Sequence, residues 1–92
     1  MKLADFPFIS KHEASKLLGV SVTTLNRWRK DPSKEWQQET HYTQRDSGEW
    51  EYNQTLLEKW RDRRLDPHGY INALQQFQQA IEASQRKGKR SA

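Results

Sequence analysis

One short segment concentrates the side chains that could make specific polar contacts. Residues 22–30 have helical spacing, and at about 100° per residue Val22, Leu25 and Trp28 fall on one side. The opposite side, with its flanks, carries hydroxyl, amide and cationic groups: Thr23, Arg27 and Lys30, then Asn26 and Thr24. One face of this helix is therefore suited to burial, and the other to hydrogen bonds and ion pairs.

No set of residues has the spacing that catalysis or metal binding requires. His12, His41 and His68 are scattered, without a second His, Cys or carboxylate at ligand spacing. The sequence has no cysteine and no glycine-rich phosphate loop, and single Ser, His and Asp residues do not define a catalytic triad. We therefore expect a protein that is not an enzyme and that has no metal site and no cofactor.

The size and composition of the chain predict one small domain. With 92 residues, of which 33% are hydrophobic and 30% charged, only a modest core can form, and a deep substrate cavity is not expected. The four tryptophans must supply much of the buried area. Without cysteines, a signal-peptide-like apolar run or a segment of bilayer length, we expect a cytoplasmic protein with no membrane partner.

Positive charge is concentrated towards the carboxyl end. The whole chain carries a formal charge of +4, which favours a polyanionic partner in general terms. Residues 1–66 contain 12 Lys and Arg against 11 Asp and Glu, so their net charge is +1. Residues 67–92 carry the remaining +3, from Arg86, Lys87, Lys89 and Arg90 against Glu82. Bulk charge therefore does not single out residues 1–66 as a binder of nucleic acid.

Capping signals bracket two helices in the amino-terminal third. Ser10 and Glu13 fit a capping box, in which the Ser10 side chain accepts from the Glu13 amide and Glu13 reaches back. Gly19 suits the left-handed residue that ends a first helix. Ser21 can cap the second helix, which we expect to run over residues 22–30.

Residues 40–53 predict a β-hairpin followed by a third helix. Residues 40–45 and 50–52 have the pattern of two short strands, with Tyr42, Trp50 and Tyr52 able to share one face. Asn53 can cap the third helix. We expect its inward face to carry Leu56, Leu57 and Trp60.

A fourth helix is expected from about residue 70 to residue 85, after a break at residues 66–69. It carries an apolar seam at spacings of four, three and four: Tyr70, Leu74, Phe77 and Ile81. Such a seam can dock on its own domain or pair two chains, and we expect it to form a homodimer interface. Residues 86–92 are expected to form a basic disordered tail.

This order of elements resembles the MerR-like and phage excisionase-like group of winged helix-turn-helix DNA-binding proteins. The resemblance covers roughly residues 8–62 and is carried by Ile9, Glu13, Ala14, Leu17, Leu18, Gly19, Val20, Ser21, Thr24, Leu25, Trp28, Gly48, Tyr52, Leu57, Glu58, Lys59 and Trp60. It implies a mainly α fold with a small β-hairpin wing. The winged helix-turn-helix would occupy residues 1–66 and be followed by a C-terminal helix over residues 67–85.

The resemblance also assigns roles by position. The second helix would enter the major groove, with Thr23, Asn26 and Arg27 at base edges, since Arg can pair with guanine, Asn with adenine, and Thr with thymine. Phosphate contacts would come from Thr24, Arg29, Lys30, Arg45, Tyr42 and Tyr52. The hairpin departs from the group's usual basic wing, because Glu49 and Glu51 stand where further cations would help.

Three functional hypotheses follow from these expectations. The first is a sequence-specific double-stranded DNA-binding protein, a small nucleoid-associated transcriptional regulator that binds inverted repeats as a dimer. The second is an excisionase-like recombination directionality factor that bends DNA at direct repeats. An integrase or a polymerase would be the protein partner in these cases. The third is a protein-interaction adaptor that has kept the fold and lost DNA binding.

Overall fold

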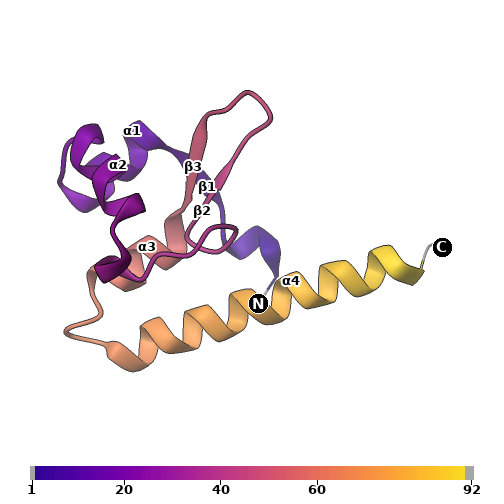
Figure 1. Ribbon diagram of the computed structural model, residues 1–92. Coiled ribbons are helices and arrows are strands. Elements are labelled where there is room, and N and C mark those ends of the chain that lie inside the picture. The colour runs from indigo at the N-terminus through magenta and orange to yellow at the C-terminus, as the bar shows by residue number, and fades with distance from the viewer. Residues whose placement is uncertain (1, 91–92) are drawn as a thin grey trace.

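Helices make up most of the chain, and three short strands form one small antiparallel sheet (Figure 1). The computed structural model describes the backbone of residues 2–90 and the side chains of residues 2–85. Within that part, short 3-10 turns occupy Leu3–Asp5 and Pro32–Lys34. The strands and helices are β1 Phe8–Ser10, α1 Lys11–Leu18, α2 Val22–Lys30, β2 Tyr42–Gln44, β3 Trp50–Asn53, α3 Gln54–Arg61 and α4 Pro67–Arg90.

The helices α1 and α2 begin and end where the sequence predicts. Ser10 caps α1, since its Oγ accepts from the Glu13 amide at 3.2 Å, and Gly19 ends α1 with φ of 70°. Glu13 does not reach back to the Ser10 amide as expected. Its carboxylate accepts from the Ser10 hydroxyl at 3.3 Å instead.

The sheet has the order β1-β3-β2, and all its pairs are antiparallel. The predicted hairpin is confirmed in β2 and β3, with β2 shorter than expected. Its turn closes through the Arg45 amide, which donates to the Glu49 carbonyl at 2.8 Å, and Gly48 adopts φ of 94°. Such a three-residue loop favours glycine at its positive-φ position. Strand β1 was not predicted, because three residues are too few to show an alternating pattern.

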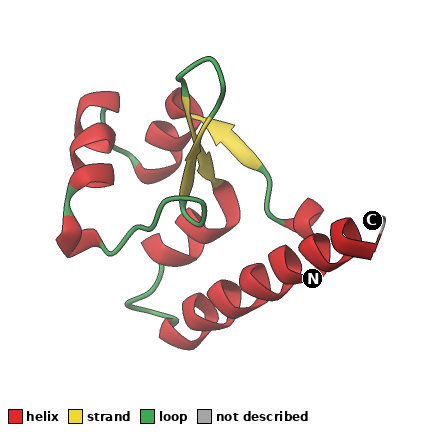
Figure 2. Cartoon of the chain, turned by 45° about the vertical axis from the view of Figure 1, so that its right-hand side comes forward, coloured by secondary structure: helices red, strands yellow, loops and turns green. Residues whose placement is uncertain are grey.

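Two apolar clusters form the core on either side of α3. The first contains Ala14, Leu25, Trp36, Tyr52, Leu57 and Trp60, and the second contains Phe6, Leu56, Ala73 and Phe77. Trp36 lies at the centre of the aromatic contacts, with its ring centroid 5.1 Å from that of Trp60 and 6.3 Å from that of Tyr52. Neither helical nor strand periodicity indicates this role, since Trp36 lies in an irregular segment. Figure 2 shows the sheet between the α1–α2 pair and α4.

The seam of α4 packs inside its own chain. Phe77 is 2% exposed, and its ring packs edge-on against Phe6 with centroids 5.0 Å apart. The second cluster also includes Leu74 and Ile81 as half-buried neighbours. The predicted dimer interface therefore makes intramolecular contacts at least in part. Phe77 is buried, whereas Tyr70, Leu74 and Ile81 remain half-buried.

The ends of α4 also differ from the prediction. Residues 66–69 were expected to separate the third and fourth helices, but they form the start of α4. Asp66 Oδ1 accepts from the Gly69 amide at 3.0 Å. Pro67 occupies the first helical position, where the missing N–H costs no hydrogen bond. The backbone remains helical to Arg90, through residues expected in a disordered tail, because Gln, Lys and Arg are good helix formers. The predicted tail beyond them, residues 91–92, lies outside the described residues.

Candidate nucleic-acid interface

The turn between α1 and α2 fixes α2 on the domain. The Val20 amide donates to the Ser15 carbonyl at 3.0 Å, which closes the end of α1. Ser21 Oγ then accepts from the Thr24 amide at 3.1 Å and caps α2. Leu25 is wholly buried in the first core cluster. Because both its start and its inner face are held, α2 presents a defined outer face to solvent.

The outer face of α2 carries polar groups that the rest of the protein does not use. Thr23, Arg27 and Lys30 are exposed and Asn26 is half-buried. Among the described side chains, ion pairs join Arg45 to Glu51 and Arg61 to Asp62, and neither involves α2. The sequence of α2 contains cations and no acidic residue. The predicted base-reading residues thus share one face whose positive charge is not neutralised by a direct ion pair.

Thr24 has a structural task at the start of α2. Its Oγ1 accepts from the Ser21 hydroxyl at 3.0 Å, while its amide donates to the same Ser21 oxygen. The side chain is half-buried. The Thr24 hydroxyl hydrogen remains able to donate, so the predicted phosphate contact is compatible with the cap.

Arg29 is turned back against the hairpin. Its Cζ lies 4.1 Å from the centroid of the Trp50 ring and 6.0 Å from that of Tyr42. A guanidinium over an aromatic face is attracted by the negative charge of the ring face. Arg29 thus joins the carboxyl end of α2 to β3, a contact that no spacing in the sequence indicates. We assign it a positioning role in addition to any contact with an anion.

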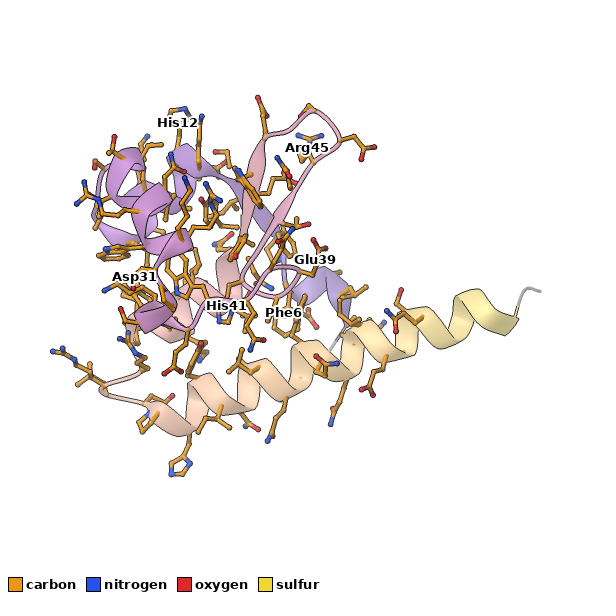
Figure 3. All side chains as sticks on the ribbon, in the orientation of Figure 1. Phe6, His12, Asp31, Glu39, His41 and Arg45 are labelled. Atoms are coloured by element: carbon orange, nitrogen blue, oxygen red, sulfur yellow. The ribbon has the colours of Figure 1, made fainter. Side chains whose placement is uncertain are left out.

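The hairpin loop offers little free positive charge. Arg45 lies 3.9 Å from the Glu51 carboxylate, with side-chain exposures of 59% and 29%. Asp46 and Glu49 are exposed in the same loop. Figure 3 shows Arg45 at the hairpin loop and His12 at the start of α1, both on the side of the molecule away from α4. An exposed pair such as Arg45 and Glu51 is weak and can open towards another anion.

The two tyrosines predicted to contact phosphate differ in accessibility. Tyr42 is half-buried, and its ring packs edge-on against Trp50 with centroids 5.6 Å apart. Tyr52 is 0% exposed in the first core cluster, so the predicted phosphate contact through its hydroxyl is wrong. Burial raises the pKa of Tyr52, and the neighbouring Arg29 partly opposes that shift.

His41 is a buried polar link that the sequence does not reveal. Its Nδ1 accepts from the Gln37 amide at 3.0 Å, and its Nε2 lies 2.8 Å from the Tyr70 hydroxyl. With Nδ1 as acceptor, the neutral ring carries its proton on Nε2 and donates it to Tyr70. Burial lowers the pKa of His41 to about 4, so the ring is neutral at pH 7. The contact joins the segment before β2, where Figure 3 labels His41, to Tyr70 of α4.

Two arginines at and just after the end of α3 are engaged by the protein itself. Arg61 pairs with Asp62 at 3.1 Å and donates through Nη1 to the Leu17 carbonyl at 3.2 Å. Arg63 lies over the Trp60 ring, with Cζ 4.2 Å from its centroid. Among the described side chains, Arg27 has no such ion pair.

Comparisons with protein-family models, with curated proteins and with solved structures find no significant match to this chain. Among the described residues, no group of three His, Cys, Asp or Glu side chains is placed to hold a metal ion. The helices within that same part of the chain are all too short or too polar to cross a membrane.

Proposed function

We propose that the protein is a sequence-specific double-stranded DNA-binding protein of the winged helix-turn-helix type, acting as a small transcriptional regulator. The observation that carries the proposal is the outer face of α2. It combines Thr23, Asn26 and Arg27, side chains suited to base edges, on a helix whose other face and start are fixed. A rigid helix that presents such groups without internal partners is suited to the major groove.

The surrounding residues support the proposal in different ways. Lys30 is exposed at the carboxyl end of α2 and would contact a phosphate, as would Arg45 once it leaves Glu51. Thr24 and Tyr42 could add neutral hydrogen bonds. Arg29 would keep the hairpin at a fixed distance from α2, because it is stacked on Trp50.

The substitution Arg27→Ala tests this role directly. If Arg27 reads a guanine, its loss should cost about 1–3 kcal/mol of binding and relax the preference at one base pair. The measurement is selection of bound fragments from a randomised duplex pool. The matched control is Arg64→Ala, which removes the same exposed cation from the loop between α3 and α4.

Each outcome of the selection has a distinct meaning. A motif that is enriched by the wild-type protein and by Arg64→Ala, but blurred by Arg27→Ala, supports the proposal. If Arg27→Ala selects the same motif as the wild-type protein, Arg27 does not recognise a base. No enrichment with the wild-type protein would overturn sequence-specific binding and favour the adaptor hypothesis.

An excisionase-like recombination factor is the second candidate function, because the α4 seam is used within the chain. With Phe77 buried inside its own chain, the seam has less apolar surface left for a symmetric dimer. A monomer that binds side by side on DNA would prefer direct repeats, whereas a dimeric regulator would prefer inverted repeats. The orientation of half-sites in the selected motif distinguishes the two.

A further inference from the structure

A pocket with mixed aromatic and charged walls lies between the carboxyl end of α2 and the sheet. Its volume is about 440 Å³, within the range of sites for small organic molecules. An inorganic ion would fill only a small part of that volume, since a water molecule occupies about 30 Å³. The residues that line it are Arg29, Lys30, Asp31, Pro32, Trp36, Gln38, Tyr42 and Trp50.

The charged residues of the pocket favour an anion. Arg29 and Lys30 contribute two cations against the single carboxylate of Asp31. Asp31 is already engaged, because its Oδ1 accepts from the Ser33 amide at 2.9 Å and from the Ser33 hydroxyl at 2.8 Å. Among the described side chains, neither Arg29 nor Lys30 forms an ion pair. The net positive charge is therefore left for a ligand.

Two residues of the pocket wall also contain buried donors that lack an acceptor. Trp36 is 7% exposed, and its indole N–H has no hydrogen-bond partner among the described residues. The Nε–H of Arg29 is likewise buried and has no hydrogen bond of good geometry among the described residues, although the guanidinium interacts with the neighbouring buried Tyr52 hydroxyl and opposes the rise in its pKa. A buried donor without an acceptor is costly, and a carboxylate that entered between these side chains could relieve that cost after a small shift.

The aromatic residues of the pocket favour a flat ligand. Tyr42 and Trp50 pack edge-to-face, and Trp50 is held in place by the guanidinium of Arg29. Half-buried rings of this kind offer surface for stacking or edge contacts with another ring. A stacked guanidinium keeps its N–H groups directed outward around the edge of its own plane, where a carboxylate can accept two of them.

We propose that this pocket, between α2 and the β2–β3 hairpin, binds a small planar aromatic carboxylate. The ring would pack against Tyr42 and Trp50, and the carboxylate would accept from Arg29 and pair with Lys30. The pocket shares Arg29, Lys30 and Tyr42 with the proposed DNA-binding face. Its test contains no DNA, so either proposal can fail while the other stands.

Benzoate is the probe for this site, compared with two relatives that each lack one feature. Benzamide is nearly isosteric and neutral, and cyclohexanecarboxylate keeps the charge on a ring that is not flat. The readout is the set of indole N–H signals in the ¹H–¹⁵N spectrum of the full chain. For a ligand of nine non-hydrogen atoms we expect a Kd of about 1 mM. The Trp36 and Trp50 signals should shift to saturation, with Trp28 and Trp60 shifting less.

Two variants locate the binding. Lys30→Ala removes an exposed cation from the pocket and should raise the Kd for benzoate about threefold. Lys59→Ala, which removes an exposed cation from α3 outside the pocket, should leave the Kd unchanged. Neither side chain is buried, so both variants are expected to fold.

Three results would contradict the proposed binding site. The first is the absence of a shift at about ten times the expected Kd. The second is an equal response to all three compounds, which would show that neither charge nor flatness is recognised. The third is an equal loss of affinity in Lys30→Ala and Lys59→Ala, which would indicate attraction by overall charge alone.

Discussion

His41 makes the stability of the protein depend on pH. In the unfolded chain a histidine takes up a proton near pH 6.5, whereas in the folded protein burial lowers the pKa of His41 to about 4. The unfolded state therefore binds more protons between these two values, so stability is complete above pH 6.5 and is lost as the pH falls towards 4. From pH 7 to pH 5, we expect the free energy of unfolding to decrease by about 2 kcal/mol, measured by urea titration.

The variant His41→Asn isolates this contribution. Asn does not titrate, so the variant should be less stable at pH 7 but should lose much less stability between pH 7 and pH 5. His12→Asn is the matched control, because His12 is exposed at the start of α1, and it should keep the wild-type dependence. A wild-type pH dependence in His41→Asn would assign the effect to carboxylates instead.

Residues whose role depends on near neighbours in the chain could be predicted, and residues that act across the fold could not. Asn53 accepts from the Leu56 amide at 3.1 Å, as its position three residues earlier predicts. The outer face of α2 follows from helical periodicity in the same way. Trp36 and His41 have no such signal, since the rings around Trp36 lie in α2, β3 and α3, and the second partner of His41, Tyr70, lies in α4. The predicted phosphate contact of Tyr52 is wrong because the sequence does not show which face of the strand is buried, and Tyr52 lies on the buried face.

At the level of elements, α4 is held to the domain by its apolar seam. Phe77 is the centre of that contact, 2% exposed against Phe6, Leu56 and Phe8. Phe77→Ala should therefore lower the free energy of unfolding by about 3–5 kcal/mol, because it removes a buried ring and leaves a cavity. Ile71→Ala, at a position that is 51% exposed on the same helix, should change it by less than about 0.5 kcal/mol.

The same pair of variants distinguishes a docked α4 from a dimer interface. If the seam packs within one chain, the unfolding midpoint of the wild-type protein is independent of protein concentration. A midpoint that rises with concentration, and loses that dependence in Phe77→Ala, would show that the seam joins two chains.

The elements were predictable to the extent that they are long or capped. The helices α1, α2 and α3 have a side-chain cap and an apolar face, and each was found from those signals. The start of α4 was misread because Asp and Pro, which often interrupt a helix, here occupy its cap and first position. Strand β1 depends on pairing with β3, a partner more than forty residues away in the sequence.

At the scale of the whole molecule, the excess charge and the proposed reading helix belong to different parts of the chain. Residues 67–92 account for +3 of the net charge of +4. In Figure 1, α4 runs along the side of the molecule away from the hairpin loop, and its carboxyl end extends past the rest of the domain. If α2 reads DNA as proposed, positive charge at that end would act on the DNA beside that site, and only through phosphates, which carry no sequence information.

Replacing Arg86, Lys87, Lys89 and Arg90 with Gln tests this division of roles, given DNA binding by α2. Affinity should fall equally for the selected duplex and for a scrambled one, because binding to phosphates is independent of sequence. The slope of log Kd against log salt should flatten by roughly one for each phosphate that the variant no longer neutralises. The control combines Lys59→Gln and Arg64→Gln, two exposed cations outside α4, and should keep the wild-type slope. An unchanged slope in the fourfold variant would show that these cations do not contact DNA phosphates. A loss of affinity confined to the selected duplex would show that they contribute to sequence recognition.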